Sequence, residues 1–288
     1  MVPESERSLR LEIGHVLFID LVGYSKLLIE EQKERLAQLI EIVLATAQVR
    51  EAPNEQLVRL PTGDIETRVA RAVVDVDERA DTDPLYRTIH DILATTPGSE
   101  STVAQQWIWL SLARRDVAEG ERAAATLSET GLGRNGLVFP RPFCRAVFAQ
   151  LRGDRSAMQD ELLKAREETE AKLQAAPDYG PTLVILGLID AALGRKEDAI
   201  REGKRATEVM PITRKSIEGA QIITYLAVIY AWTGEKDLAI DRLEESARIP
   251  AGVSYGDLKL LSYFDALRGN PRFEQIVADL AQKAGPNQ

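Results

Sequence analysis

The feature that most constrains the fold is a short loop that recurs along the chain, each time between two stretches of helical pattern. Each loop contains a Gly or an Asp, and we take as markers Asp116, Gly153, Gly194, Gly234 and Gly269. Successive markers are 37, 41, 40 and 35 residues apart. Helix pairs that repeat at such intervals are typical of α-solenoids, in which each pair buries its apolar face against its neighbours. The sequence therefore predicts a mainly α fold, built as a solenoid of helix pairs.

The clearest repeats lie within residues 180–251. The first helix of each unit carries a small residue, Gly187 or Ala227, and the helix after the turn carries Ala199 or Ala239. Small residues at these positions allow the two helices of a pair to approach closely. This stretch resembles the tetratricopeptide repeat (TPR) family, in which the first helices of successive pairs line a concave groove that holds peptides or partner helices.

The resemblance implies a groove lined mainly by apolar side chains, without the Lys, Arg and Asn set that clamps a peptide carboxylate. We therefore expect an apolar segment of a protein or peptide partner there, or a neighbouring part of the protein itself. The alternative is that these side chains only pack between helices. The groove residues implied by the resemblance are Val184, Leu188, Ala191, Ala192, Gln221, Thr224, Val228 and Trp232.

Three segments follow from the pattern. Residues 101–288 are predicted to form the TPR-like helical repeat domain, and residues 65–100 a helical linker with the first helices. Residues 1–64 differ, because the apolar, β-branched stretch at residues 15–22 indicates a buried strand, and Ser25 is a suitable N-cap for the helical pattern that follows. A second strand pattern ends this part, so we predict a short strand–helix–strand α/β segment before the helices.

Two stretches of this segment, VLFIDLVGYSKL and RLPTGD, resemble the bacterial class III adenylate/guanylate cyclases over about residues 13–64. The resemblance implies that Asp20 and Asp64 hold two Mg²⁺ or Mn²⁺ ions on a nucleoside triphosphate, aided by the backbone carbonyl of Leu21. Carboxylate and carbonyl oxygens are the hard ligands that Mg²⁺ prefers. No other cofactor is expected.

The same resemblance implies a nucleotide-binding stretch at Gly23, Tyr24 and Ser25. Gly23 allows the backbone to approach the phosphates closely, and Ser25 opens a helix whose N-terminus favours anions. Residues 65–68 (IETR) are charged and helix-like, whereas the family continues with Gly and a strand. The Asn and Arg that stabilise the transition state in the family have no counterpart in the chain, and such donors supply much of the rate of phosphoryl chemistry.

We therefore predict a non-enzymatic protein–protein interaction or scaffold protein with an inactive cyclase-like N-terminus. The alternative is a nucleotide cyclase, or its regulatory half, acting as a homodimer or paired with a complete cyclase.

Charge and composition limit the kinds of partner and the compartment that we expect for this chain. A formal net charge of −9, without a block of basic residues, argues against nucleic-acid and anionic membrane partners. The longest apolar run, residues 222–232, is shorter than the roughly 20 residues that a membrane helix needs. Cys144 is the single cysteine, and together with an N-terminus without an apolar stretch it favours the cytoplasm. We predict that Cys144 is a buried small hydrophobe, and that Trp107 and Trp109 pack between repeats, with ligand stacking as the alternative.

Overall fold

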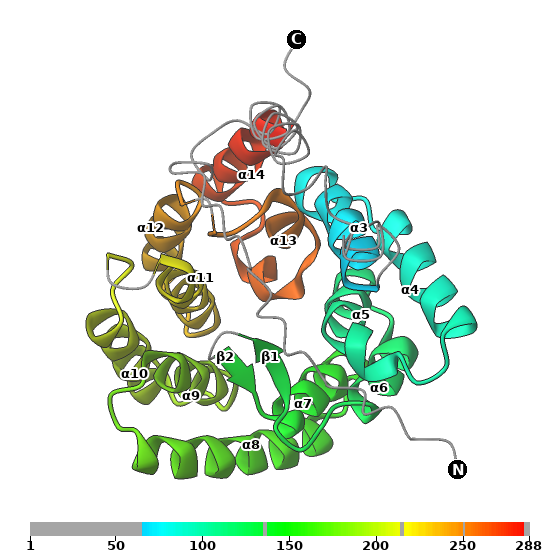
Figure 1. The fold of residues 1–288 in the computed structure, drawn as a ribbon. Helices are drawn as coiled ribbons and strands as arrows, with labels where there is room; N and C mark the ends of the chain where they lie inside the picture. Colours follow the sequence, from blue (N-terminus) through cyan, green and yellow to red (C-terminus); the bar gives the residue numbers. More distant parts are fainter. Residues whose placement is uncertain (1–64, 135–136, 214–215, 250, 285–288) are drawn as a thin grey trace, which may run out of the picture. The chain divides into compact units, whose positions relative to one another are not determined.

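The computed structural model describes residues 65–134, 137–213, 216–249 and 251–284. The predicted strand–helix–strand segment falls within residues 1–64 and so lies outside the described residues. Contacts divide the chain into two compact units, Met1–Leu57 and Val58–Gln288. The elements below all belong to the second unit and are considered within it alone (Figure 1).

Helices dominate the described part of the chain, which confirms the prediction of a mainly α protein. Within the described residues, no helix is both long enough and apolar enough to cross a membrane. In chain order the elements are α3 (Ile65–Arg79), α4 (Asp83–Thr95), α5 (Glu100–Arg114), α6 (Val117–Ala125), β1 (Leu132–Arg134), β2 (Leu137–Phe139), α7 (Arg141–Arg152), α8 (Arg155–Ala175), α9 (Gly180–Ala192), α10 (Lys196–Val209), α11 (Ser216–Trp232), α12 (Lys236–Ser246), α13 (Tyr255–Leu260), the 3₁₀ helix η2 (Ser262–Leu267) and α14 (Pro271–Ala284).

Consecutive helices pack in pairs: α5 with α6, α7 with α8, α9 with α10 and α11 with α12. The close approach predicted for Gly187 and Ala199 is confirmed, since a Cβ atom added at Gly187 would lie 3.0 Å from the Ala199 carbonyl oxygen. It would also lie 2.8 Å from the Cδ1 of Ile229, on α11. The missing side chain thus lets α9 contact both its partner helix and the next pair.

The predicted loop markers are turns in which one residue takes the left-handed conformation that closes a helix. The four glycine markers have positive φ angles: Gly153 (80°), Gly194 (77°), Gly234 (85°) and Gly269 (80°). In the first loop the left-handed residue is Arg115, with φ 55°, and not the predicted marker Asp116. Asp116 instead caps α6, because its side chain accepts a hydrogen bond of 3.1 Å from the backbone N–H of Glu119.

Two elements differ from the sequence-based prediction. Within residues 101–288, which were predicted to be helical repeats, β1 and β2 pair as a short antiparallel hairpin in which Leu132 lies opposite Phe139. The hairpin depends on Gly133, whose φ is 144° and where an added Cβ would lie 1.8 Å from the carbonyl oxygen of Leu137. Before the marker Gly269, where the sequence predicts a helical stretch, the element is the 3₁₀ helix η2, and the α-helix α14 follows the marker.

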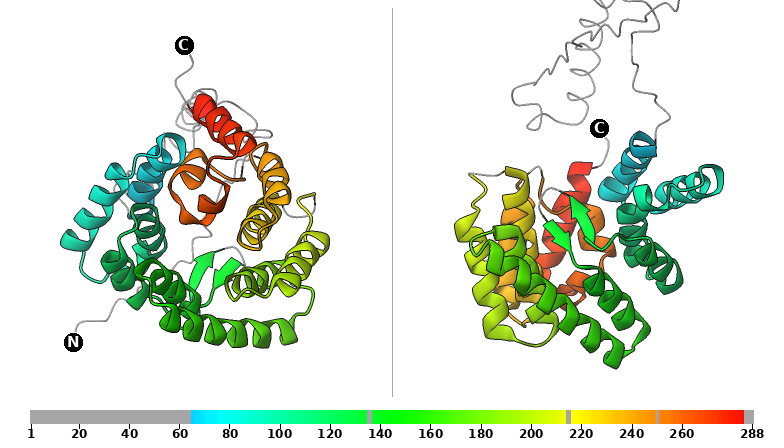
Figure 2. Two further views of the ribbon diagram at one scale, coloured as in Figure 1. Left: turned by 180° about the vertical axis from the view of Figure 1, so that it is seen from behind. Right: turned by 60° about the horizontal axis from the view of Figure 1, so that its bottom comes forward.

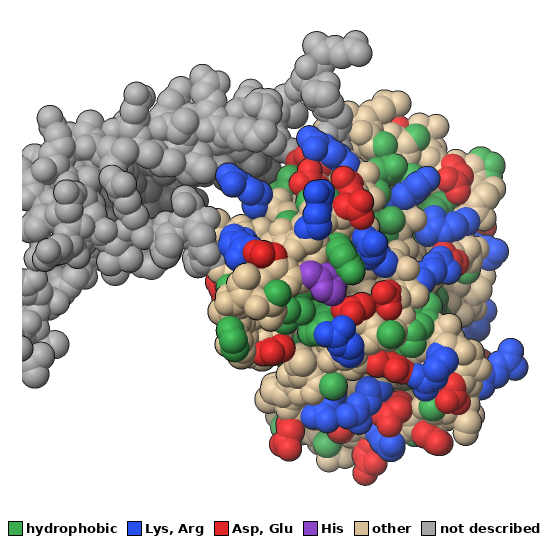
Figure 3. Space-filling view, turned by 90° about the vertical axis from the view of Figure 1, so that its right-hand side faces the viewer, with side chains coloured by type: hydrophobic (Ala, Val, Ile, Leu, Met, Phe, Trp, Pro, Cys, Tyr) green, Lys and Arg blue, Asp and Glu red, His purple; other side chains and the backbone are tan. Residues whose placement is uncertain are grey.

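Within this unit the helices follow a closed curve, because α13 and α14 pack against α3 (Figures 1 and 2). The contact between α13 and α3 is tight: a Cβ added at Gly256 would lie 2.2 Å from the carbonyl oxygen of Val76. The hairpin and η2 lie on the inner side of the curve, where β1 contacts α5, β2 contacts α9 and η2 contacts α11. On the outer face shown in Figure 3, acidic and basic side chains are intermingled.

Candidate functional site

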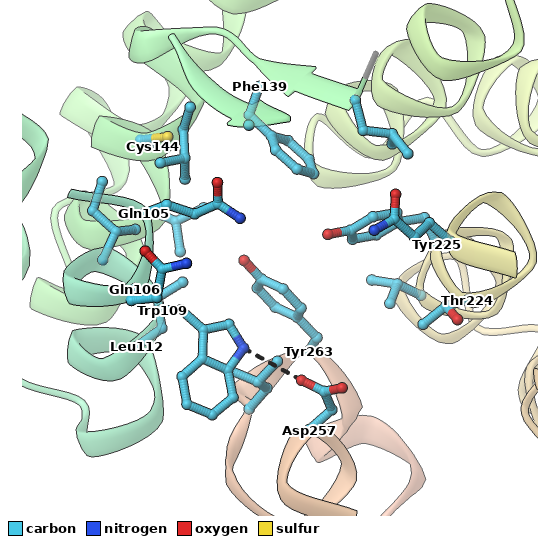
Figure 4. Close-up of a pocket in the computed structure, with 18 of the residues that line it drawn as sticks. Gln105, Gln106, Trp109, Leu112, Phe139, Cys144, Thr224, Tyr225, Asp257 and Tyr263 are labelled. Atoms are coloured by element: carbon cyan, nitrogen blue, oxygen red, sulfur yellow. Dashed lines mark hydrogen bonds between the residues drawn. The ribbon is translucent and has the colours of Figure 1, made fainter. Parts of the chain in front are cut away.

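The inner side of the helices encloses a cavity of about 440 Å³ (Figure 4). Small-molecule sites in proteins commonly have volumes of about 300 to 1,000 Å³, so this cavity falls within that range. Most of its lining is apolar, with contributions from α3, α5, the hairpin, α7, α11, α13 and η2. The polar lining residues are Asp77, Gln105, Gln106, Trp109, Cys144, Gln221, Thr224, Tyr225, Asp257 and Tyr263.

One wall of the cavity is formed by α5, which directs Gln105, Gln106 and Trp109 inward. The indole Nε1 of Trp109 donates a hydrogen bond of 3.3 Å to Oδ1 of Asp257. The other carboxylate oxygen of Asp257 accepts hydrogen bonds from the backbone N–H (3.1 Å) and the hydroxyl (2.9 Å) of Ser254. The backbone bond from Ser254 and a bond of 3.0 Å from the Asp257 N–H to the Ser254 hydroxyl oxygen form a capping box at the start of α13. The Asp257 side chain is therefore held in one position.

A second carboxyl group, that of Asp77 on α3, lies at the same acidic end of the cavity. Burial, followed by the charge of Asp257, raises the pKa of Asp77 to about 6, while a hydrogen bond with the Ser254 side chain opposes this increase. Burial also raises the pKa of Asp257, while the hydrogen bonds from Ser254 and Trp109 oppose this increase. The two acids therefore lie close enough, in a poorly solvated place, for the charge of Asp257 to disfavour ionisation of Asp77.

Aromatic side chains bring hydroxyl groups to the middle of the cavity. In Figure 4 the hydroxyls of Tyr225 and Tyr263 both point into the open space. Burial raises the pKa of both phenols, so both are neutral donors at physiological pH. The ring of Phe139 packs edge-on against Tyr225, with centroids 5.4 Å apart. This contact fixes the hairpin against α11.

Two further groups bear on what the cavity can do. Cys144 is buried, as predicted, and burial raises the pKa of its thiol to about 12, so it remains protonated and is not a nucleophile. The Oε1 atom of Gln221 is buried without a hydrogen-bond partner among the described residues. An unpaired buried acceptor is costly, but this oxygen is too deeply buried for a molecule in the cavity to contact it.

The residues predicted to line a groove fall into different places. Gln221, Thr224 and Val228 line the cavity. Val184 and Leu188 are buried among the helices and do not line it.

Trp232, on the last turn of α11, is covered by the chain itself. Its indole Nε1 donates a hydrogen bond of 3.1 Å to the carbonyl oxygen of Tyr263, and the two rings pack edge to face. The part of the inner surface that Trp232 forms is therefore occupied by η2.

The residues implied by the cyclase resemblance lie outside the described part of the chain: Asp20, Leu21, Gly23, Tyr24, Ser25 and Asp64. Among the described residues, no three His, Cys, Asp or Glu side chains are grouped so that they could hold a metal ion.

Sequence reasoning missed most of the polar groups that meet in the cavity, including Asp77 and Asp257. A signal was present in α5, where Gln105 and Gln106 interrupt an apolar run between Val103 and Leu110. The two tryptophans of this helix have different surroundings. Trp107 is buried and donates a hydrogen bond of 2.8 Å to Glu119, on the next helix, whereas Trp109 faces the cavity.

Comparisons with protein-family models, with curated proteins and with solved structures gave no match to this chain. A functional assignment must therefore be based on the cavity and on the sequence motifs.

Proposed function

We propose that this chain is a non-enzymatic binding protein, in which a TPR-like array of helix pairs holds a small ligand in its central cavity. The observation that carries the proposal is the cavity itself. It has a volume of about 440 Å³ and a mostly apolar lining, onto which amides, hydroxyls and carboxyls converge. Small-molecule sites typically combine these properties, since the apolar surface supplies affinity and a few polar groups fix the orientation.

The repeat geometry supports the TPR-like part of the proposal. The left-handed turn residues Arg115, Gly153, Gly194 and Gly234 follow one another at intervals of about 40 residues, and each connects the two helices of a pair. The small residues between α9 and α10 are those of the sequence resemblance. An array of such pairs has a concave side, and the cavity lies on that side.

The contacts on the concave side favour a small ligand over a partner helix. Phe139 of the hairpin packs against Tyr225, and Trp232 is bonded to Tyr263 of η2, so the chain's own segments already cover much of this surface. A helix with side chains is about 10–12 Å wide and would have to displace both segments. The apolar occupant expected for the groove is thus supplied in part by the protein itself, and a space of small-molecule size remains.

The groups in the cavity support binding better than catalysis. The Cys144 thiol is protonated, and no histidine is among the described residues that line the cavity. Nucleophilic catalysis needs an activated nucleophile beside a base, and this lining offers none within the described residues. The remaining amides, hydroxyls and carboxyls are suited to holding a ligand by hydrogen bonds.

The proposal can be tested with 1-aminoanthracene, a small neutral fluorophore whose emission increases in dry cavities. We expect saturable fluorescence enhancement with the full chain. Gln105→Trp, which fills the cavity from α5, should abolish it. Thr102→Trp places the same ring at an exposed position of the same helix and should leave it unchanged. Equal enhancement with both variants, or none with the unmodified chain, would contradict ligand binding in the cavity.

A second candidate function is favoured by the motifs around Asp20 and Asp64. A nucleotide cyclase, or its regulatory half paired with a complete cyclase, would use these carboxylates to hold Mg²⁺ or Mn²⁺ on a nucleoside triphosphate. Formation of cyclic nucleotide from Mn²⁺ and ATP, lost in Asp20→Ala, would support this function. Background turnover that is the same in both proteins would exclude catalysis by this segment.

A further inference from the structure

We infer that the ligand of the cavity is a small organic cation, an amine that carries at least one N–H on an apolar body. The inference rests on the proposed function and specifies the chemistry of the same site. Among the described residues that line the cavity, two are carboxylic acids and none is Lys, Arg or His. A cation brings the opposite charge that this set lacks, whereas an anion would be repelled.

Among the groups of the cavity, Asp77 is the one beside which a bound cation is most favourable. It lies in the last turn of α3, at the end of the helix that carries the partial negative charge of the helix dipole. The neighbouring charges that act on it, those of Asp257 and Glu78, are both acidic. A positive group beside Asp77 would therefore be attracted by both cavity carboxylates and by the end of the helix.

Asp257 has a different part. Both carboxyl groups interact with the Ser254 side chain, but Asp257 is held by further hydrogen bonds. It accepts hydrogen bonds from the backbone and side chain of Ser254 and from Trp109. Its negative charge still acts on its surroundings, but its position is fixed by α13 and α5. Asp77 is thus the direct anchor in this inference, and Asp257 contributes through its charge.

The rest of the lining fits the other parts of an amine. The rings of Trp109 and Tyr225 offer faces that attract a cation and surface that packs against an apolar body. The N–H groups of an ammonium can also donate charged hydrogen bonds to the Asp77 carboxylate. A quaternary ammonium would satisfy the charge but could make no such bond, so we expect an amine with N–H groups to bind better.

A matched set of three probes tests the charge preference: 2-phenylethylammonium, the neutral 2-phenylethanol and the anionic phenylacetate. Their affinities for the full chain are measured at pH 7.5 by calorimetry and by displacement of 1-aminoanthracene. We expect the cation to bind about tenfold more tightly than the alcohol, as is usual for a charged hydrogen bond, and the anion to bind most weakly.

Variants of α3 assign the preference to one carboxylate. Asp77→Asn keeps the size of the side chain and should remove the preference for the cation, whereas Asp77→Glu should retain it. Asp75→Asn is the matched control, since Asp75 is on the same helix but accepts a hydrogen bond from Arg79 and does not line the cavity. It should bind the cation as the unmodified chain does.

The outcomes separate this inference from the proposed function. Equal binding of cation and alcohol, with no effect of Asp77→Asn, would overturn the inference while 1-aminoanthracene binding still supports a ligand cavity. Tighter binding of phenylacetate would overturn it as well. If 1-aminoanthracene and all three probes fail to bind, both the proposed function and the inference fail.

Discussion

Trp109 donates a hydrogen bond of 3.3 Å to Asp257, across 148 positions of sequence, and so joins α5 to α13. Because α13 also packs on α3, this bond lies where the last elements of the unit contact the first ones. Both side chains line the cavity, so the bond that completes the fold also shapes the site.

Replacing Trp109 by Phe tests this relationship. The variant keeps an aromatic ring but removes the N–H, leaving Oδ1 of Asp257 without this donor, and we expect a loss of about 1 kcal/mol in the free energy of unfolding. It should also weaken binding of 1-aminoanthracene. Trp107→Phe is the control, since it removes a comparable bond to Glu119 away from the cavity. Urea unfolding followed by circular dichroism and probe titration would measure both effects; weaker probe binding in Trp107→Phe too would contradict the prediction.

The raised pKa of Asp77 predicts a pH dependence of stability. The folded state keeps this proton up to about pH 6, whereas the ordinary pKa of an Asp side chain is 3.8. Between these values the folded state binds more protons than the unfolded state, so the contribution of Asp77 to stability falls as the pH rises. A shift of about two pKa units corresponds to at most about 3 kcal/mol.

Asp77→Asn should remove this slope and make the protein more stable than the unmodified chain above pH 6. The measurement is urea unfolding of both proteins at pH 4.5, 6 and 7.5, with Asp75→Asn as the control. Parallel pH profiles for the unmodified chain and Asp77→Asn would show that Asp77 titrates normally.

The helix pairs could be predicted because their turns depend on local chemistry. A left-handed residue is needed where each first helix ends, and Gly takes that conformation without strain, so Gly153, Gly194 and Gly234 are visible in the sequence. Arg115 was missed because a non-glycine residue occupies the same conformation. Its guanidinium is paired with Asp265 at 2.9 Å, a contact with a distant residue that no local pattern shows.

The cavity could not be predicted because it, too, depends on contacts between residues that are distant in sequence. Its acidic end depends on contacts of Trp109 and of Gly256 with residues far away in sequence, and no periodicity encodes such contacts. Gln221, Thr224 and Val228, which line the cavity, were expected on the inner side because the TPR resemblance places them on the first helix of a pair. The hairpin had a local signal, the Asn135-Gly136 pair directly before the apolar residues 137–139, because this pair favours a tight turn.

Gly120 and Phe148 provide a test of packing between α6 and α7. A Cβ added at Gly120 would lie 2.0 Å from the ring of Phe148, which is buried. Gly120→Ala improves helix propensity by about 1 kcal/mol, but overpacking a core costs about 1–3 kcal/mol, so we expect a net loss of stability. In the Phe148→Leu background the same change should cost less. A double-mutant cycle of unfolding free energies measures the difference, and additive effects would contradict direct contact.

Arg166 and Asp190 form the ion pair that joins α8 to α9, and they give the last prediction. Arg166 Nε donates a hydrogen bond of 2.7 Å to Oδ1 of Asp190, whose side chain is only 1% exposed. Burial raises the pKa of Asp190, and the bond from Arg166 opposes that increase. Oδ2 of Asp190 is buried without a hydrogen-bond partner among the described residues, so this carboxylate depends strongly on Arg166.

Arg166→Leu leaves the carboxylate buried without its main partner, which typically costs about 3–5 kcal/mol. Its pKa should rise further, so the loss should be largest at neutral pH and smaller near pH 4, where Asp190 can be protonated. Arg166→Leu combined with Asp190→Leu removes both charges and should recover much of the stability. Arg201→Leu, at an exposed pair with Asp198, is the control and should change stability by less than about 1 kcal/mol. Urea unfolding at pH 4.5 and 7.5 tests the set, and a pH-independent loss in Arg166→Leu would show that lost packing, not the unpaired charge of Asp190, is the cause.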